Sequence, residues 1–249
     1  MKFKIVALLK DFILFTRIPS LFSFIYRPLK FVVNAIGLSR WINKHNADLS
    51  FNDFFRGKRV YTQRQALHQY VIDKEGLNKD KIDYLEFGVF GGTSFKWWLK
   101  NQNHLESKFF GFDTFEGLPE DWFLFKKGDM SMSQPELDDD RGQFIKGLFQ
   151  ETLGDFLRKN YSLENRKSAA RKVIHMDADL FSSTLFVLTS LAPYLNDGDI
   201  IFFDEFSVPN HEFAAWETFV ASYYVDYEVL GAVNNYYQIA IKYKGIKVN

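Results

Sequence analysis

Acids and glycines next to predicted strands are the residues of this chain best suited to bind a small ligand. An apolar run at 82–87 predicts a buried strand, which contains Glu86 and ends at Gly88. A helix is expected from Ser94, so the turn between them presents backbone N–H groups and a helix N-terminus to a ligand. Asp113 ends the next predicted strand, where its carboxylate could accept hydrogen bonds from both hydroxyls of a ribose.

The glycine turn itself discriminates between adenosyl ligands. A dinucleotide fingerprint needs glycine at its first, third and sixth positions, so that the backbone can contact a pyrophosphate. Here the turn reads Gly88-Val-Phe90-Gly91-Gly92, with Phe90 at the third position. Glu86 would repel phosphate but suits an ammonium group. An amino-acid end and a ribose on one ligand predict S-adenosylmethionine. The alternative is a generic strand–helix turn with acids near solvent.

The elements that must position these residues alternate between strand and helix. Strands are expected at 82–87, 108–113, 143–149, 172–176, 199–203, 227–230 and 236–243, and helices at 63–75, 94–102, 152–160, 182–194 and 212–223. This alternation predicts an α/β fold with a doubly wound, mostly parallel sheet. Four of the strands are followed by acids or glycines, at the edge where open α/β sheets bind ligands.

The N-terminal segment, residues 1–58, differs in character from residues 59–249. Before Asp48 the chain has eight basic residues and one acid, Asp11, between apolar clusters. No uninterrupted apolar run reaches the roughly 18 residues of a membrane span. Two interpretations remain: a basic amphipathic segment at 1–38 on an anionic membrane surface, or short helices packed on the domain or on a second subunit. The exposed aromatic side chains also predict a homo-oligomer.

The amino-acid composition argues against several classes of function. The 31 Lys and Arg residues balance 31 Asp and Glu residues, which gives no support for nucleic-acid binding. The chain has no Cys, which excludes disulfides, thiolate metal sites and a Cys nucleophile. Absence of Cys fits a reducing compartment. We therefore expect a cytoplasmic protein, with membrane association left open.

Four motifs in order carry a resemblance to a known family. They are Glu86 to Ser94, Gly111 to Glu120, Lys146 to Leu153, and Asp177 to Thr184 followed by Gly198 to Glu205. Together they resemble the macrocin O-methyltransferase family of class I S-adenosylmethionine-dependent methyltransferases, over about 61–243. The resemblance implies a Rossmann-like sheet of seven strands with an antiparallel last strand. It also implies O-methylation, in the named members of a sugar hydroxyl and often with Mg²⁺, so the expected partner is a small hydroxylated acceptor.

The expected cofactor site follows from the turn and from these motifs. Gln143, Gly147 and Phe149 would border the adenine, and the loop at 114–134, with Phe115, Leu118 and Trp122, could close over the cofactor and exclude water. The cofactor-binding residues that we predict are Glu86, Gly88, Phe90, Gly91, Thr93, Ser94, Asp113, Thr114, Gly147 and Asp177.

Acids near the last parallel strands are the expected catalytic residues. A sugar hydroxyl is a poor nucleophile at neutral pH, and a divalent cation would lower its pKa. Asp177, Asp204 and Glu205 end adjacent predicted strands, where similar enzymes place three oxygen ligands, and such ligands suit Mg²⁺. Asp179 is the rival of Asp177. Besides Asp177, His211 is the expected catalytic residue, as general base.

Two other functions stay open at this level. One is a nicotinamide-dependent oxidoreductase on a similar sheet, against which Phe90 argues. The other is a non-catalytic membrane-surface protein built on a methyltransferase fold, for which the basic N-terminal segment argues.

Overall fold

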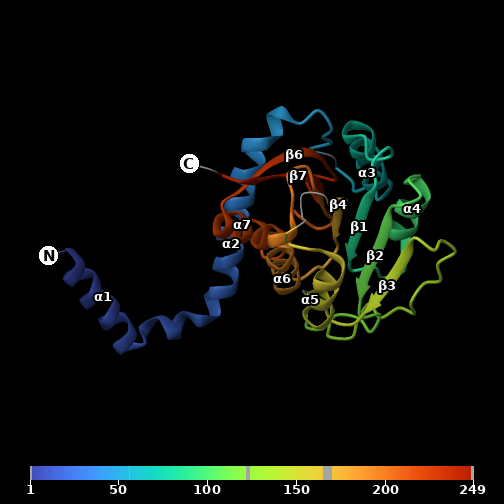
Figure 1. Cartoon of the computed structure of the whole chain (residues 1–249). Helices are drawn as coiled ribbons and strands as arrows, with labels where there is room; N and C mark the ends of the chain where they lie inside the picture. Colours follow the sequence, from blue (N-terminus) through green and yellow to red (C-terminus); the bar gives the residue numbers. More distant parts are fainter. Residues whose placement is uncertain (1, 56, 122–123, 165–169, 248–249) are drawn as a thin grey trace.

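The computed structural model describes residues 2–55, 57–121, 124–164 and 170–247. Its centre is a seven-stranded sheet in the order β3-β2-β1-β4-β5-β7-β6 (Figure 1). Strands β1 to β5 pair in parallel, and β7 runs antiparallel to β5 and β6. This confirms the predicted fold class. The strands are β1 (Ile82–Phe87), β2 (Lys108–Asp113), β3 (Gly142–Lys146), β4 (Arg171–Met176), β5 (Ile200–Phe203), β6 (Val225–Val233) and β7 (Gln238–Ile246).

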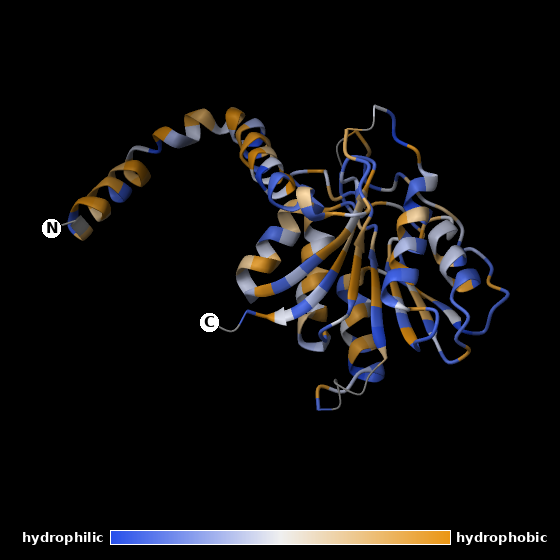
Figure 2. Ribbon diagram, turned by 90° about the horizontal axis from the view of Figure 1, so that it is seen from above, coloured by the Kyte–Doolittle hydropathy of each residue, from blue (hydrophilic) through white to orange (hydrophobic). Residues whose placement is uncertain are grey.

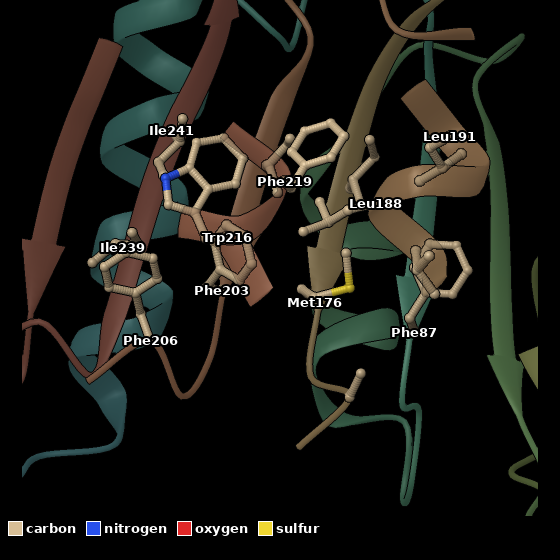
Figure 3. Close-up of a cluster of buried hydrophobic side chains, with 14 of the residues drawn as sticks. Phe87, Met176, Leu188, Leu191, Phe203, Phe206, Trp216, Phe219, Ile239 and Ile241 are labelled. Carbon is tan, nitrogen blue, oxygen red and sulfur yellow. The ribbon is translucent and has the colours of Figure 1, made fainter. Parts of the chain in front are cut away.

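Helices cover both faces of the sheet. On one face lie α3 (Thr62–Glu75) and α4 (Thr93–Asn101), and on the other lie α5 (Phe149–Asn160), α6 (Phe181–Leu191) and α7 (Glu212–Tyr223). Every residue of β1 is buried, as expected for a strand covered on both sides. Tyr84 packs with α3 and α4, whereas Phe87 packs with the other layer. Figure 3 shows that second layer, with Met176, Phe203 and Trp216 in one apolar cluster.

Some element boundaries differ from those that the sequence predicts. Gly147 has φ +141°, which few other residues adopt, so β3 ends before it and α5 begins already at Phe149. The final hairpin is longer than expected. Its turn contains Asn234, Asn235 and Tyr236, all with positive φ, which Asn tolerates better than most residues. These shifts move Phe149 from a strand to a helix N-terminus.

The segment between β2 and β3, residues 114–141, is irregular over its described part, as predicted for 114–134. It folds back on the domain through Phe115 and Leu118, which are both buried. Backbone hydrogen bonds between Leu118 and residues Gly128 and Asp129 close it into a compact loop. Trp122, which was expected to cover the cofactor, lies outside the described residues.

The chain begins with two helices that project from the domain (Figures 1 and 2). They are α1 (Lys2–Thr16) and α2 (Ser23–His45), joined by the 3-10 helix η1 (Ile18–Phe22). The expected N-terminal helical extension is thus confirmed, although α2, with 23 residues, is longer than the short helices that we expected. Within the described residues, one helical stretch, Ile18–Asp48, is long and apolar enough to span a membrane by length and composition alone.

The last part of α2 belongs to the domain. Leu38, Trp41 and Ile42 are buried in the core, and Trp41 Nε1 donates a hydrogen bond of 2.8 Å to the Tyr227 hydroxyl. The 3-10 helix η2 (Asn46–Asp48) follows, and Asn52 then forms a bridge with Ala232 of β6. The boundary expected at residue 58 stays a prediction.

Candidate active site

A cavity of about 260 Å³ lies at the carboxyl ends of the parallel strands. Residues that follow β1, β2, β4 and β5 form its walls, together with the start of α5 and part of the irregular 114–141 segment. One part of the lining is apolar and includes Leu118, Met130, Leu148 and Phe149. Another part is acidic and consists of Asp113, Asp177, Asp179 and Glu205. A site of this kind suits a ligand with a flat apolar part and a polar or cationic part.

Asp113 holds the glycine turn in place. Its Oδ2 accepts hydrogen bonds of 2.8 Å from the backbone N–H groups of both Val89 and Phe90, and its Oδ1 accepts one of 2.7 Å from Phe115. A carboxylate has about four acceptor positions, so roughly one remains for a ligand. The amides of Val89 and Phe90 are thus already bonded, which leaves these two unavailable to a pyrophosphate. Asp113 has capacity for one ribose hydroxyl rather than the two that we expected.

Gly88 is required by the close approach of two strand ends. It has φ +94°, and a Cβ atom at this position would lie 1.8 Å from the backbone oxygen of Asp177. No side chain fits there, because real Cβ contacts of that length do not occur. The ends of β1 and β4 therefore touch, and this contact puts the turn and Asp177 on the same cavity.

The predicted cofactor residues separate into two groups. Gly88, Phe90, Asp113, Thr114 and Asp177 line the cavity. Gly147 instead borders an adjacent cavity beside the 114–141 segment. Four others are not among the lining residues of either cavity: Glu86, Gly91, Thr93 and Ser94. Their roles in cofactor binding stay predictions.

Glu86 points into the protein rather than into the cavity. It is 1% exposed, the Tyr84 hydroxyl donates a hydrogen bond to its Oε2, and His175 Nδ1 lies 3.6 Å from the same oxygen. The side-chain alternation of β1 explains this, because Glu86 and Tyr84 share the face that packs on α3 and α4. Glu86 therefore makes no contact with the cavity in this structure, and its expected contact with a ligand ammonium stays a prediction. Asp177 is the nearer candidate for that contact, since it lines the cavity beside the turn.

The acids expected to bind a metal are divided between the cavity and the protein interior. Asp177 and Glu205 line the cavity, whereas Asp204 lies behind them and is 8% exposed. Asp179, the rival of Asp177, also lines the cavity and has φ +56°. Glu205 is held by two contacts: the Tyr237 hydroxyl donates to its Oε1, and its backbone N–H donates to Glu212 Oε2 at 2.9 Å.

Two cations lie against these carboxylates. Arg64 of α3 places Nη1 2.7 Å from Asp204 Oδ2 and 3.7 Å from Asp177 Oδ2. His175 is fully buried, with Nε2 4.0 Å from Asp204 Oδ1. Burial alone would lower the pKa of His175, but the carboxylates of Asp204 and Glu86 raise it to about 9. The two carboxylates therefore favour the protonated imidazole, which would make His175 a cation beside Asp204.

The carboxyl pKa values show that negative charge is in excess. Burial, and then the charge of Glu205, raise the pKa of Asp179 to about 8. Burial and the neighbouring charges of Asp204 and Asp179 raise the pKa of Asp177, although 30% of its side-chain surface is exposed. The pKa of Asp204 is lowered despite burial, because His175 and Arg64 neutralise it. Neighbouring cations thus compensate the charge of Asp177, Asp179 and Glu205 less well than they compensate the charge of Asp204.

These residues fit a divalent cation. Among the described residues, the cation within 4.0 Å of the cavity acids is Arg64, which is shared with Asp204, so a divalent ion would offset the remaining negative charge. All the donors at the cavity are oxygens, as Mg²⁺ prefers. Single donor atoms of His175, Asp177 and Asp204 also lie within 4.8 Å of one another, but His175 and Asp204 are buried behind the cavity and Arg64 already pairs with Asp204. Asp177, Asp179 and Glu205 are the better set.

His211 is the N-cap residue of α7 and is not among the residues that line the cavity. Burial and the charge of Lys30 lower its pKa, while Glu120 opposes this effect. A lowered pKa keeps the imidazole neutral at pH 7, as a general base requires. The expected role of His211 as base stays a prediction.

Arg64 is the site residue that sequence reasoning missed. It lies on α3, one element before the glycine turn, in a helix whose pattern predicted only packing. Its contact with Asp204 spans 140 positions of the chain, and no local motif indicates such a pair. Leu148 and Gln150 were also missed, because the start of α5 was expected to be a strand end followed by a turn.

Comparisons with known proteins agree with this architecture. Residues 85–206 match the family model described as a methyltransferase domain, which supports methyl transfer as the reaction and S-adenosylmethionine as the donor. The solved structure of the calicheamicin methyltransferase CalS11 is similar at 20% identity and a TM-score of 0.55, covering 72% of this chain and 77% of that one. The O-methyltransferase NovP is similar at 19% identity and a TM-score of 0.53, covering 75% and 80%.

These likenesses establish that the chain has the class I methyltransferase fold. At such identities they carry information on the fold alone. The comparison with curated proteins gives no match.

Proposed function

We propose that this chain is an S-adenosylmethionine-dependent O-methyltransferase that methylates a hydroxyl of a sugar or of another small hydroxylated acceptor, with assistance from Mg²⁺. The observation that carries the proposal is the composition of one cavity. It joins the turn bonded to Asp113 with the acids Asp177, Asp179 and Glu205. A cofactor site and an oxygen-donor site thus lie within reach of each other, as an in-line methyl transfer requires.

The cofactor side of the cavity is suited to the donor. The remaining acceptor position of Asp113 would bind one ribose hydroxyl. Leu118, Leu148 and Phe149 supply an apolar surface for the adenine ring. Asp177 would accept a hydrogen bond from the ammonium group or bind the metal. When bound, S-adenosylmethionine supplies an electrophilic methyl group on a sulfonium centre.

The acid-lined part of the cavity must activate the acceptor hydroxyl as a nucleophile. Asp177, Asp179 and Glu205 would hold Mg²⁺, which when bound lowers the pKa of a hydroxyl that it contacts. The acceptor oxygen then forms a bond to the methyl carbon, the carbon–sulfur bond breaks with its electrons left on sulfur, and the hydroxyl proton passes to a base. Buried Phe115 and Leu118 exclude water that would compete with the acceptor. Arg64 and His175 keep Asp204 ionised beside this site.

Ligand binding provides the first experiment. We expect S-adenosylmethionine and S-adenosylhomocysteine to raise the melting temperature of the full chain, and NAD to leave it unchanged, because the turn amides are occupied by Asp113. Stabilisation by NAD alone would reverse the assignment in favour of an oxidoreductase.

Turnover with a panel of sugars and phenols, followed as S-adenosylhomocysteine release, then tests the reaction. Asp177→Asn and Glu205→Gln should reduce Mg²⁺-dependent turnover about 100-fold or more. Asp138→Asn, at an exposed acid outside the cavity, is the matched control. Full activity of both variants in the presence of a chelator would contradict the metal-assisted mechanism.

A further inference from the structure

Residues 2–33 form an arm that leaves the domain (Figure 2), and the apolar side chains of this arm are exposed to solvent. The arm consists of α1, η1 and the first half of α2. Phe3 is 93% exposed, Phe15 is 89% exposed and Phe24 is 76% exposed. A soluble protein rarely presents so many large apolar side chains in one continuous segment unless another surface covers them.

The exposed side chains surround the helices instead of forming a single stripe. In α1, Ile5, Leu8 and Phe12 follow helical spacing along one side, while Val6, Ile13 and Leu14 occupy other sides and are also exposed. A helix that docks on one protein partner buries an apolar stripe about 100° wide and keeps polar residues on its opposite face. A helix that is apolar on nearly all sides fits the acyl region of a lipid layer.

The positive net charge of the arm favours an anionic lipid surface. Residues 2–33 contain six basic residues and one acid, a net charge of +5, and the neutral total means that the remainder of the chain carries −5. Basic residues next to an anionic leaflet contribute about 1 kcal/mol each to membrane binding, which is about fivefold in affinity. The net charge of the arm is therefore opposite in sign to that of the remainder. The six are Lys2, Lys4, Lys10, Arg17, Arg27 and Lys30.

The geometry favours a position in the membrane interface over a transmembrane span. The 15 residues of α1 extend about 22 Å at 1.5 Å per residue, which is shorter than a hydrocarbon core of about 30 Å. In the helical stretch Ile18–Asp48, the part before the first contact with the domain, residues 18–29, extends about 20 Å. From Lys30 onward α2 contacts the domain, through the Phe181 ring, through the hydrogen bond of 2.8 Å from Asn34 Nδ2 to Asn210, and through buried Leu38 and Trp41.

We propose that the arm anchors the protein by lying in the interface of an anionic membrane. Its attachment faces the cavity end of the domain. Lys30 Nζ lies 5.5 Å from the Phe181 ring centroid, at the start of α6, and Asn210 follows β5. The anchored protein would thus hold the carboxyl edge of its sheet near the bilayer. Vesicle binding through the arm does not depend on methyl transfer, so the two proposals succeed or fail separately.

The test is co-sedimentation of the full chain with vesicles of phosphatidylcholine mixed with phosphatidylserine, and with vesicles of phosphatidylcholine alone. We expect binding to the mixed vesicles that weakens as salt is added. Lys4→Gln together with Lys10→Gln should lower the partition coefficient about 25-fold. Leu8→Ser together with Phe12→Ser should reduce binding by a comparable or larger factor, because two exposed apolar side chains are lost.

Matched controls lie outside the arm. Lys100→Gln with Lys159→Gln removes two exposed charges, and Leu105→Ser with Leu163→Ser removes two exposed apolar side chains. Both double variants should change the partition coefficient less than twofold.

Equal loss of vesicle binding in these control variants would overturn the proposal. A stable dimer that does not bind vesicles would also overturn it, because the apolar side chains of the arm would then be buried against a second copy of the chain. Resistance to extraction at alkaline pH, with residues 18–33 protected from protease on both sides, would also overturn it in favour of a span.

Discussion

Arg64 of α3 forms an ion pair with Asp204 at the end of β5, with Nη1 2.7 Å from Oδ2. The same guanidinium lies 3.7 Å from Asp177 Oδ2 at the end of β4. A helix on one face of the sheet therefore supplies a permanent positive charge to two neighbouring strand ends. Together with His175 it lowers the pKa of Asp204, whereas burial and the charges of Asp204 and Asp179 raise the pKa of Asp177.

Replacing Arg64 should reveal how much the repulsion between these carboxylates destabilises the folded chain. Arg64→Gln leaves buried Asp204 and partly exposed Asp177 without their guanidinium, and we expect the free energy of unfolding in the absence of divalent ions to fall by about 3 kcal/mol. Urea denaturation measures it. Arg158→Gln breaks the exposed pair with Asp155 and should change stability by no more than about 0.5 kcal/mol. Equal effects of the two substitutions would show that the buried pair contributes nothing.

Two glycines of the same turn should respond differently to alanine. A Cβ at Gly88 would meet the backbone oxygen of Asp177 at 1.8 Å, so Gly88→Ala must separate β1 from β4 and should abolish binding of S-adenosylmethionine or prevent folding. Nothing lies within 4 Å of a Cβ at Gly91, so Gly91→Ala should keep the melting temperature within a few degrees and binding within about threefold. Calorimetric titration of both variants measures this, and similar affinities would contradict the close approach.

Substitution of His211 tests the base assignment. If His211 accepts the hydroxyl proton, His211→Ala should reduce kcat about 100-fold at neutral pH and leave the KM for S-adenosylmethionine unchanged. Its pKa lies below 6.5, so the wild-type rate should fall on the acid side of that value as the imidazole is protonated, and the variant should lack that decrease. His104→Ala, between α4 and β2, is the control. Normal turnover of His211→Ala would remove this residue from the mechanism.

A partly buried cluster of Glu75, Lys242 and Arg171, outside the cavity, should contribute to stability in a pH-dependent way. Burial would raise the pKa of Glu75, but hydrogen bonds from Lys242 and Arg171 lower it below its ordinary value of 4.5. The pair therefore stabilises the folded chain above pH 4.5, and this contribution disappears as the pH falls through the folded-state pKa. Glu75→Gln should cost about 2 kcal/mol at pH 7.

The difference between wild type and Glu75→Gln should shrink on acidification, which unfolding curves at several pH values would measure. A constant difference would contradict the linkage. Glu106→Gln, in an exposed pair with Lys81, is the control and should change little at any pH.

Much of the fold was predictable from local patterns. Buried parallel strands are short apolar runs, and β1, β2, β4 and β5 were each recognised within one residue because glycines or acids end them. β3 was placed less well, since it is partly exposed and lacks a continuous apolar run. The projecting helices were also misjudged: charges and prolines interrupt their apolar clusters in sequence, but a proline such as Pro28 did not end α2.

The sequence by itself determined the alternation of elements, the glycine turn and the presence of acids at the carboxyl edge, because each of these is written in contiguous residues. The tertiary structure decided how those acids are used. It turned Glu86 inward, bonded Asp113 to the turn amides, and placed Arg64 and His175 against Asp204. The physical reason is that ionisation and hydrogen bonding depend on the distance and burial of groups far apart in the chain, which no local spacing encodes.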